Sequence, residues 1–228
     1  MGSRTVRREA LITDRLAVGS KFDKYHPEDA KEVRTAEVRP GKVGELKVAW
    51  KNYKFEMGWW TIAPDMVYRK ALEAIKDVHY SARDVEAFAV ALSEFQHEFA
   101  FAFKAGVLLS ALINKSDETR FFIPTHHLDT LICCLGYRNT KNIIVNGNLS
   151  AWTGQSMQSG KIIVNGNVDN GVGKEMEGGS ITVNGNAAEV VGWSMKGGEI
   201  HLNGGYEGIA GDVKGKIFHR GKLVVDVR

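Results

Sequence analysis

The sequence has little of what marks secreted or membrane-spanning proteins. Its 228 residues include only two cysteines, the adjacent Cys133 and Cys134, so a disulfide framework is excluded. It contains no apolar run of 18 residues and no secretory leader pattern, which argues against a membrane span and against export. We therefore expect a cytoplasmic protein.

Charge of one sign is also scarce. The 30 lysines and arginines are interspersed with 27 acidic residues, which leaves a net charge of +3. Such a small and scattered excess gives no electrostatic reason to bind nucleic acid or an anionic membrane. We expect neither as a partner.

What the chain does contain is a 19-residue repeat in its C-terminal part. The motif Val-Asn-Gly-Asn, or a close variant, begins at Val145, Val164, Val183 and Leu202. The same step separates Gly154, Gly173, Gly192 and Gly211, and also Met157, Met176 and Met195. Because three independent markers keep one register, the repeat is not a chance pattern.

Each copy of the repeat predicts one coil of a β-helix. A short β-branched stretch, such as residues 162–164, lies between Asn-Gly and Gly-Gly turn signals. A copy is too short for a strand–helix–strand unit, and its glycines and β-branched residues disfavour a helix. The pattern therefore predicts a parallel β-helix whose coils stack about 4.8 Å apart.

Stacking in this register sorts the side chains into columns, because residues two apart on a strand share one face. The predicted interior columns are Ile143, Ile162, Ile181 and Ile200, then Val145, Val164, Val183 and Leu202, then the three methionines. The predicted ladder of side-chain amides is Asn146, Asn165, Asn184 and Asn203. Ile163, Thr182 and His201 are predicted to face outward. The repeated glycines are predicted to occupy turns with positive φ.

This repeat, Val-Asn-Gly-Asn followed by Gly, Met and Gly-Gly, resembles the glycine-rich domain that ends the large subunit of glutamate synthase. It is also similar to the C subunit of formylmethanofuran dehydrogenase. The resemblance covers residues 141–215 and implies a right-handed, single-stranded parallel β-helix with 19-residue coils. It further implies a scaffold inside a larger enzyme that does not hold the reacting groups.

The last copy departs from this pattern. The segment 211–215 is shorter by two residues than its predecessors and lacks the methionine. We expect the last coil to close differently, with His219 and Arg220 as a polar cap or a contact surface.

The rest of the chain predicts a separate N-terminal domain, α+β or mainly helical, over residues 1–135, followed by the β-helix over 141–228. Residues 1–40 are polar and mixed in charge, which favours a solvated or partner-packed tail. Alternation predicts strands near 43–48 and 53–57. Trp59 and Trp60 are interpreted as core or interface residues, with a ligand pocket as the alternative.

Helices are predicted after this point. One begins at Pro64, and a second begins with a capping box at Ser81 and Asp84. The second carries an apolar stripe of Val85, Phe88, Leu92, Phe95 and Phe99. Apolar residues then widen to all sides as far as 113, which favours packing against another subunit. A strand at 121–124 and a short helix at 128–135, closed by Gly136 and covering the first coil, should follow.

Two groups of residues have the spacing of metal ligands. Glu94 and His97 have the Glu-x-x-His spacing of di-iron helical bundles, but the chain has no second copy. His126, His127 and Asp129 could form a transition-metal donor set together with His97. Adjacent side chains usually point apart, so we interpret both groups as polar surface and expect no metal.

No catalytic group can be assigned from motifs. The Gly-x-Ser sequences at 154–156 and 192–194 lack the final glycine of a nucleophile elbow and its strand–turn–helix context. Asn-Gly-Asn is not a phosphate loop, because no helix follows it. We expect no cofactor.

The resulting hypothesis is a non-catalytic scaffold or assembly module that forms a homo-oligomer or docks onto a larger enzyme complex. One alternative is an enzyme with a site between the two domains or on a β-helix face. Another is a protein that binds a small ligand or glycan through Trp152, Trp193 and Tyr206, which lie near equivalent corners.

Overall fold

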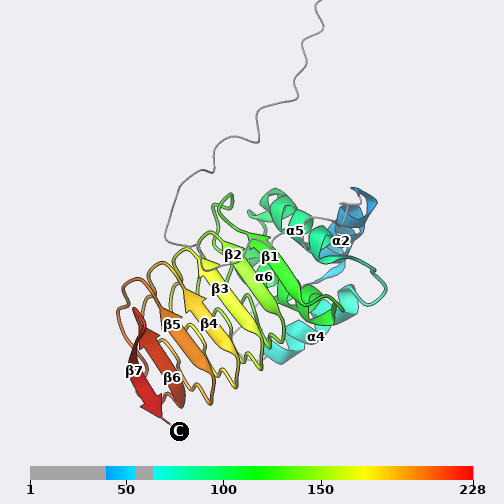
Figure 1. Ribbon diagram of the computed structural model, residues 1–228. Helices are drawn as coiled ribbons and strands as arrows, with labels where there is room; N and C mark the ends of the chain where they lie inside the picture. The colour runs from blue at the N-terminus through cyan, green and yellow to red at the C-terminus, as the bar shows by residue number, and fades with distance from the viewer. Residues whose placement is uncertain (1–39, 55–63, 228) are drawn as a thin grey trace, which may run out of the picture. The chain divides into compact units, whose positions relative to one another are not determined.

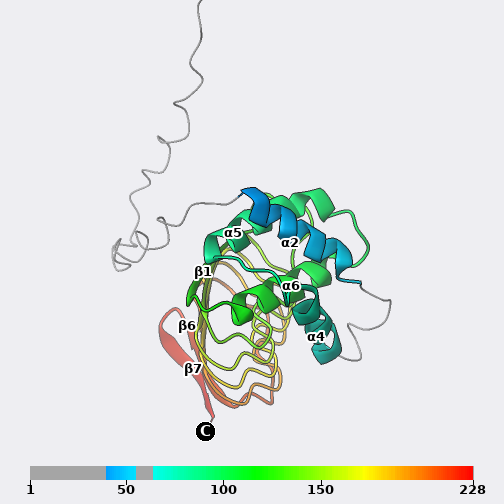
Figure 2. The same cartoon turned by 90° about the vertical axis from the view of Figure 1, so that its right-hand side faces the viewer.

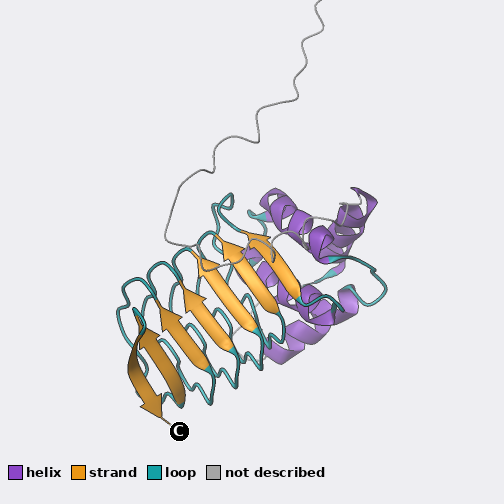
Figure 3. Cartoon of the chain, viewed as in Figure 1, coloured by secondary structure: helices purple, strands orange, loops and turns teal. Residues whose placement is uncertain are grey.

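The computed structural model describes residues 40–54 and 64–227. Its helices are α2 (Pro40–Asn52), α4 (Pro64–Ala74), α5 (Ala82–Ala91), the 3₁₀ turn η1 (Leu92–Phe95) and α6 (Phe101–Lys115). Its strands are β1 (Arg120–Pro124), β2 (Asn142–Asn146), β3 (Lys161–Asn165), β4 (Ser180–Val183), β5 (Glu199–Leu202), β6 (Gly215–His219) and β7 (Lys222–Val227). The order is therefore helices first and then a β-solenoid (Figures 1 and 3).

The seven strands form one sheet in sequence order. Strands β1 to β6 are parallel, and β7 turns back to pair antiparallel with β6. Each loop between parallel strands completes one coil, and the end-on view in Figure 2 shows these loops stacked behind one another. The predicted parallel β-helix is confirmed.

The predicted interior columns are also confirmed. The register pairs Ile143 with Ile162, and Ile162 with Ile181, and the valine column pairs in the same way. All residues of both columns, and the three methionines, are at most 1% exposed. The core of the solenoid is thus a set of apolar stacks in which each side chain packs on its counterpart one coil away.

The outward positions differ in their exposure. Thr182 and His201 are half-buried, as expected for one face of a sheet, and Ile144 in the same column is 41% exposed. Ile163 occupies the outward register beside Ile144, yet it is only 8% exposed. This one residue is more buried than its position predicts.

The asparagine ladder forms as predicted. Each side-chain amide donates to the amide oxygen one coil earlier, from Asn165 to Asn146 at 2.8 Å and from Asn184 to Asn165 at 2.7 Å. Asn203 continues the chain with a 2.7 Å bond to Asn184. The ladder satisfies polar groups at a corner where every coil turns in the same way.

The solenoid begins earlier than the predicted range of 141–228. Strand β1 already pairs in parallel with β2, and the segment after it is a coil rather than the helix predicted at 128–135. The N–H of Cys134 donates to the carbonyl of Ala151 in the next coil at 3.0 Å. Because such bonds run between coils, the local i to i+4 bonds of a helix cannot form. That prediction was wrong.

The cover for the first coil is α6. The N–H of Cys133 donates to the carbonyl of Ala102 in α6 at 3.0 Å. Gly106 lies so close to the carbonyl of Cys133 that any Cβ would overlap it, so only glycine permits this approach. The Ser110 hydroxyl accepts from the N–H of Gly136 at 2.9 Å. The helices and the solenoid therefore share one hydrophobic core.

The strand predicted at 43–48 is wrong, because this segment belongs to helix α2. Its buried residues are Leu46, Ala49 and Trp50, and Tyr53 directly after its end is buried too; the steps of three and four between them are helical. Val48, one of the apolar residues of the alternating pattern, is 57% exposed. Most of the second predicted strand, Trp59, Trp60 and the first 39 residues lie outside the described residues.

The long second helix is broken into α5, η1 and α6. The capping box of Ser81 with Asp84 is present as predicted, and α6 ends at Lys115 near its predicted end. Between them, Ala100 has a φ of 57°, which stops the helix and begins a new one. Phe99 is 60% exposed, whereas Phe95 is 7% exposed and stacks on Trp50 with ring centroids 5.3 Å apart.

Apart from Phe99, the residues of the apolar stripe therefore pack in the core of this chain. Val85, Phe88 and Leu92 are fully buried, and α6 is buried on most sides by its own chain. None of the helices in the described residues combines the length and apolar character needed to cross a membrane.

The last coil closes differently, as expected. Ile217 pairs with Ile200, 17 residues earlier rather than 19. Relative to the 19-residue coil, the first residue is lost before Ile209, which bridges to Val191 only 18 residues earlier. The second is lost after Lys214, whose N–H still bonds the carbonyl of Met195 with one residue lost. Val213, which is 5% exposed, takes the place of the missing methionine.

These packing differences predict effects of different size at two phenylalanines. Phe95→Glu buries a carboxylate against Trp50 and should lower the free energy of unfolding by about 3–5 kcal/mol. The control Phe99→Glu, at an exposed position of the same stripe, should lower it by less than about 1 kcal/mol. Denaturant unfolding monitored by circular dichroism measures both. A Phe95→Glu protein that keeps its stability but loses molecular mass would instead restore the interface interpretation.

Candidate functional site

The turns opposite the sheet carry a stack of polar and aromatic side chains. One row of equivalent positions is Gln155, Lys174, Trp193 and Gly211, and the row beside it is Ser156, Glu175, Ser194 and Asp212. Ser156, Glu175 and Ser194 all have φ between 52° and 55°. Because their backbones share one left-handed conformation, their side chains leave the coil in the same direction and meet.

Lys174 lies at the centre of this stack. Its Nζ is 5.3 Å from the ring centroid of Trp152 and 4.6 Å from that of Trp193. The Glu175 carboxylate is 3.8 Å away, and the lysine side chain is 19% exposed. A cation near two indole rings is stabilised by their electron-rich faces, so we call these four residues the Lys174 cluster.

Serine–carboxylate bonds join successive coils beside the Lys174 cluster. The Ser156 hydroxyl donates to Glu175 at 3.2 Å, and the Ser194 hydroxyl donates to Asp212 at 2.8 Å. Asp212 also accepts from the backbone N–H of Ser194 at 3.0 Å. The N–H and hydroxyl of Ser194 hold the pKa of Asp212 below its usual range, so this carboxylate is ionised at neutral pH.

The structure thus assigns a role to the serines of the two Gly-x-Ser sequences. Ser156 and Ser194 bind carboxylates of the following coil. Neither bonds a histidine, the usual base of an activated serine nucleophile, in the described part of the chain. They stabilise the stacking of turns.

The histidines of the possible metal set are not brought together with other donors. The His127 Nε2 lies 3.1 Å from the carbonyl of Val90, and its ring meets that of His126 edge-on at 5.6 Å. Asp129 is bonded to Gln96, and Glu94 to Lys47. In residues 40–54 and 64–227, no three side chains of the histidine, cysteine and carboxylate types form a group that could hold a metal ion.

The three aromatic residues considered for glycan binding separate into two places. Trp152 and Trp193 share the Lys174 cluster, whereas Tyr206 packs edge-on against His219 with ring centroids 5.0 Å apart. His219 stands at the end of the valine column, and its Nε2 lies 3.0 Å from the carbonyl of Gly204. It closes the apolar column with a polar group, as the sequence suggested.

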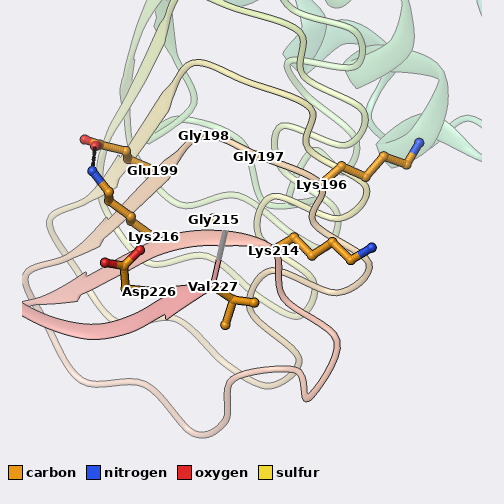
Figure 4. Close-up of a pocket in the computed structure, with 9 residues that line it drawn as sticks. All are labelled: Lys196, Gly197, Gly198, Glu199, Lys214, Gly215, Lys216, Asp226 and Val227. Atoms are coloured by element: carbon orange, nitrogen blue, oxygen red, sulfur yellow. Dashed lines mark ion pairs between the residues drawn. The ribbon is translucent and has the colours of Figure 1, made fainter.

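An open pocket of about 370 Å³ lies at the corner of the last two coils (Figure 4). Lys196, Lys214 and Lys216 line it with Glu199 and Asp226. The Lys216 ammonium is 3.5 Å from Glu199 (Figure 4), and that of Lys196 is 3.4 Å from Glu177. The pocket has no nucleophile beside a base, so it offers charge but no evident chemistry.

A second lysine is buried against an aromatic ring in the helical part. The Nζ of Lys104 is 4.1 Å from the ring centroid of Trp50 and 3.3 Å from Glu98, and its side chain is 9% exposed. Burial lowers the pKa of Lys104, and the Glu98 carboxylate opposes that effect. Glu98 also accepts from the Trp50 indole at 3.0 Å. This group links α2 to α6.

Sequence reasoning missed both lysine clusters. The Lys104 group joins residues far apart in the chain, and no local pattern identifies it. The contact between Lys174 and Trp193 could have been found, because these two residues are 19 apart and stand at the same position of the repeat, whereas Trp152 is three positions away from it.

Comparison with family models, with curated proteins and with solved structures finds no match to this chain. The resemblance to the glutamate synthase domain therefore remains an expectation drawn from the repeat.

The Lys174 cluster leads to a stability prediction. Lys174→Met keeps the unbranched stem but removes the charge between the two indoles, so the unfolding midpoint should fall by about 2–4 °C. The control Lys161→Met changes an exposed lysine on β3 and should move the midpoint by less than about 1 °C. Calorimetry measures both midpoints. Equal shifts in the two variants would show that the cation–π contacts contribute nothing.

Proposed function

We propose that the protein is a non-catalytic scaffold or assembly module, which self-associates or docks onto a larger complex. The observation that carries this proposal is the open C-terminal edge of the sheet at β7. An enzyme, or a protein with a ligand or glycan site on a β-helix face, is the alternative.

The two ends of the solenoid are closed in different ways. At the first coil, α6 covers the interior and α5 packs against β1. At the last coil, β7 pairs with β6 on one side and with no other described strand on the other. An unpaired edge presents a row of free N–H and C=O groups to any strand that reaches it.

Apolar side chains gather on this same strand. Leu223 is 49% exposed, Val224 is 44% exposed and Val227 is 47% exposed. Adjacent exposed aliphatic residues on an edge strand are unfavourable unless a partner covers them. The combination of free backbone groups and apolar side chains is suited to pairing with another protein chain.

Strand β7 also has features that oppose nonspecific pairing at its free edge. The register with β6 shifts between Ile217 and Phe218, and charged Lys222 and Asp226 flank the valines. Bulges and charges are devices by which edge strands avoid random aggregation. A partner would have to fit a bent, charged strand, which favours a specific assembly.

The packing of the solenoid interior and the bonding of its polar side chains also support a structural role. The interior of the solenoid is filled by stacked side chains. Ser156 and Ser194 bind carboxylates of the following coil, and the Glu94 carboxylate binds Lys47. The resemblance of the repeat to scaffold domains of larger enzymes points the same way.

The proposal predicts that β7 controls assembly. The double variant Leu223→Lys, Val224→Lys should remain folded but lose its partner, because two added charges oppose burial of the edge. Val48→Lys on α2 is the control, because Val48 is exposed like Leu223 and Val224 but is far from β7 in the sequence. Native mass spectrometry of protein purified from its own host should show a larger assembly for the unchanged chain and for the control.

Two results would contradict this proposal. One is an unchanged protein that is a monomer without partners. The other is a β7 variant that assembles as well as the Val48→Lys control. A bound small molecule on the purified monomer would favour the alternative function.

A further inference from the structure

The last coil shares two features with the surroundings of Lys174, a tryptophan on a neighbouring coil and a carboxylate at the next residue, but it has glycine where the lysine would stand. Gly211 stands one coil after Trp193 in the row that also contains Lys174, because Ile209 pairs with Val191 and Lys214 bonds Met195. Trp193 therefore has Lys174 on the coil before it and Gly211 on the coil after it. Its indole is 44% exposed.

The space beside Gly211 is open. A Cβ added at Gly211 would meet no atom within 4 Å, and the same holds for Gly208. The coil is also one residue short here, so Val190 has no counterpart above it and is 38% exposed. The position of a side chain at Gly211 is therefore open, one coil after the Trp193 indole that already contacts Lys174.

A carboxylate stands beside this space in the same way as beside Lys174. Glu175 follows Lys174, accepts from Ser156 and pairs with the lysine. Asp212 follows Gly211 and accepts from Ser194. Each carboxylate oxygen has a second lone pair, so Asp212 can still accept from a cationic donor.

We propose that Trp193 and Asp212 form a binding site for an alkylammonium or guanidinium group supplied by another molecule. The cation takes the position of the side chain that Gly211 lacks, with the indole below it and the carboxylate beside it. The repeat itself provides the precedent, since Lys174 occupies the corresponding place two coils earlier.

The charges around the site favour a weak and specific contact. Lys174 contacts the same indole from the coil before it, Lys214 lies further along the coil of Gly211, and Glu207 adds a second carboxylate to this coil. A single ammonium group will bind weakly at so open a site. A lysine or arginine of a docked protein, or a polyamine, would share this chemistry.

The test is an NMR titration of the full chain with butylammonium, and with butanol as the uncharged control. Butylammonium should shift the Trp193 indole N–H signal in a saturable manner, and butanol should not. Trp193→Phe identifies the signal, and the Trp152 indole serves as an internal reference. Asp212→Asn should weaken binding at least threefold.

A second variant fills the site with a lysine of the protein itself. Gly211 does not have a positive φ, so Gly211→Lys places a lysine over the indole without backbone strain. It should abolish the response to butylammonium and raise the unfolding midpoint by about 1–4 °C. Gly208→Lys, at another open glycine, is the control and should leave binding unchanged.

Several outcomes overturn the proposal. These are a butanol response equal to that of butylammonium, a shift that does not saturate, or a Gly211→Lys protein that still binds. If the site is confirmed, comparing spermidine with a lysine-containing peptide distinguishes a free amine from a protein partner. The site is distinct from β7, so its failure would leave the proposed assembly role intact, and the reverse also holds.

Discussion

Hydrogen bonding between successive coils is the constraint on which the rest of the structure depends. The N–H of Gly173 bonds the carbonyl of Thr153 at 2.9 Å, and the N–H of Gly192 bonds that of Val172 at 2.8 Å. Such bonds form only if each coil follows the path of the one before it. A turn that has a left-handed residue in one regular coil therefore has one in the next regular coil as well.

This constraint explains why glycines recur at a constant spacing within the chain. Gly154, Gly173 and Gly192 have φ of 70°, 68° and 74°. At Gly154 a Cβ would also collide with the side chain of Ile181 in the core. Positive φ and close approach together leave glycine as the residue that fits.

Because of the same constraint, the two proposed contacts with other molecules lie where the repeat becomes irregular. Within the regular coils, each polar group meets its counterpart one coil away, as the asparagine ladder shows. Among the described residues no further coil follows the last one, so β7 pairs with one strand and the space beside Gly211 is open. Both proposed contacts with other molecules therefore lie at the end of the solenoid.

The sequence by itself determined the register, the interior columns and the amide ladder, because each depends on identical residues at one fixed spacing. It also determined the capping box at Ser81, which is a local interaction. It failed at 43–48 and 128–135, because burial of Trp50 against Phe95 and bonding of Cys134 to the next coil are contacts between distant residues. Only the tertiary structure decided that most of the apolar stripe is core, that α6 closes the first coil, and that Gly211 stands one coil after Trp193 and next to Asp212. These features depend on which segments fold onto one another, and local periodicity carries no information about that choice.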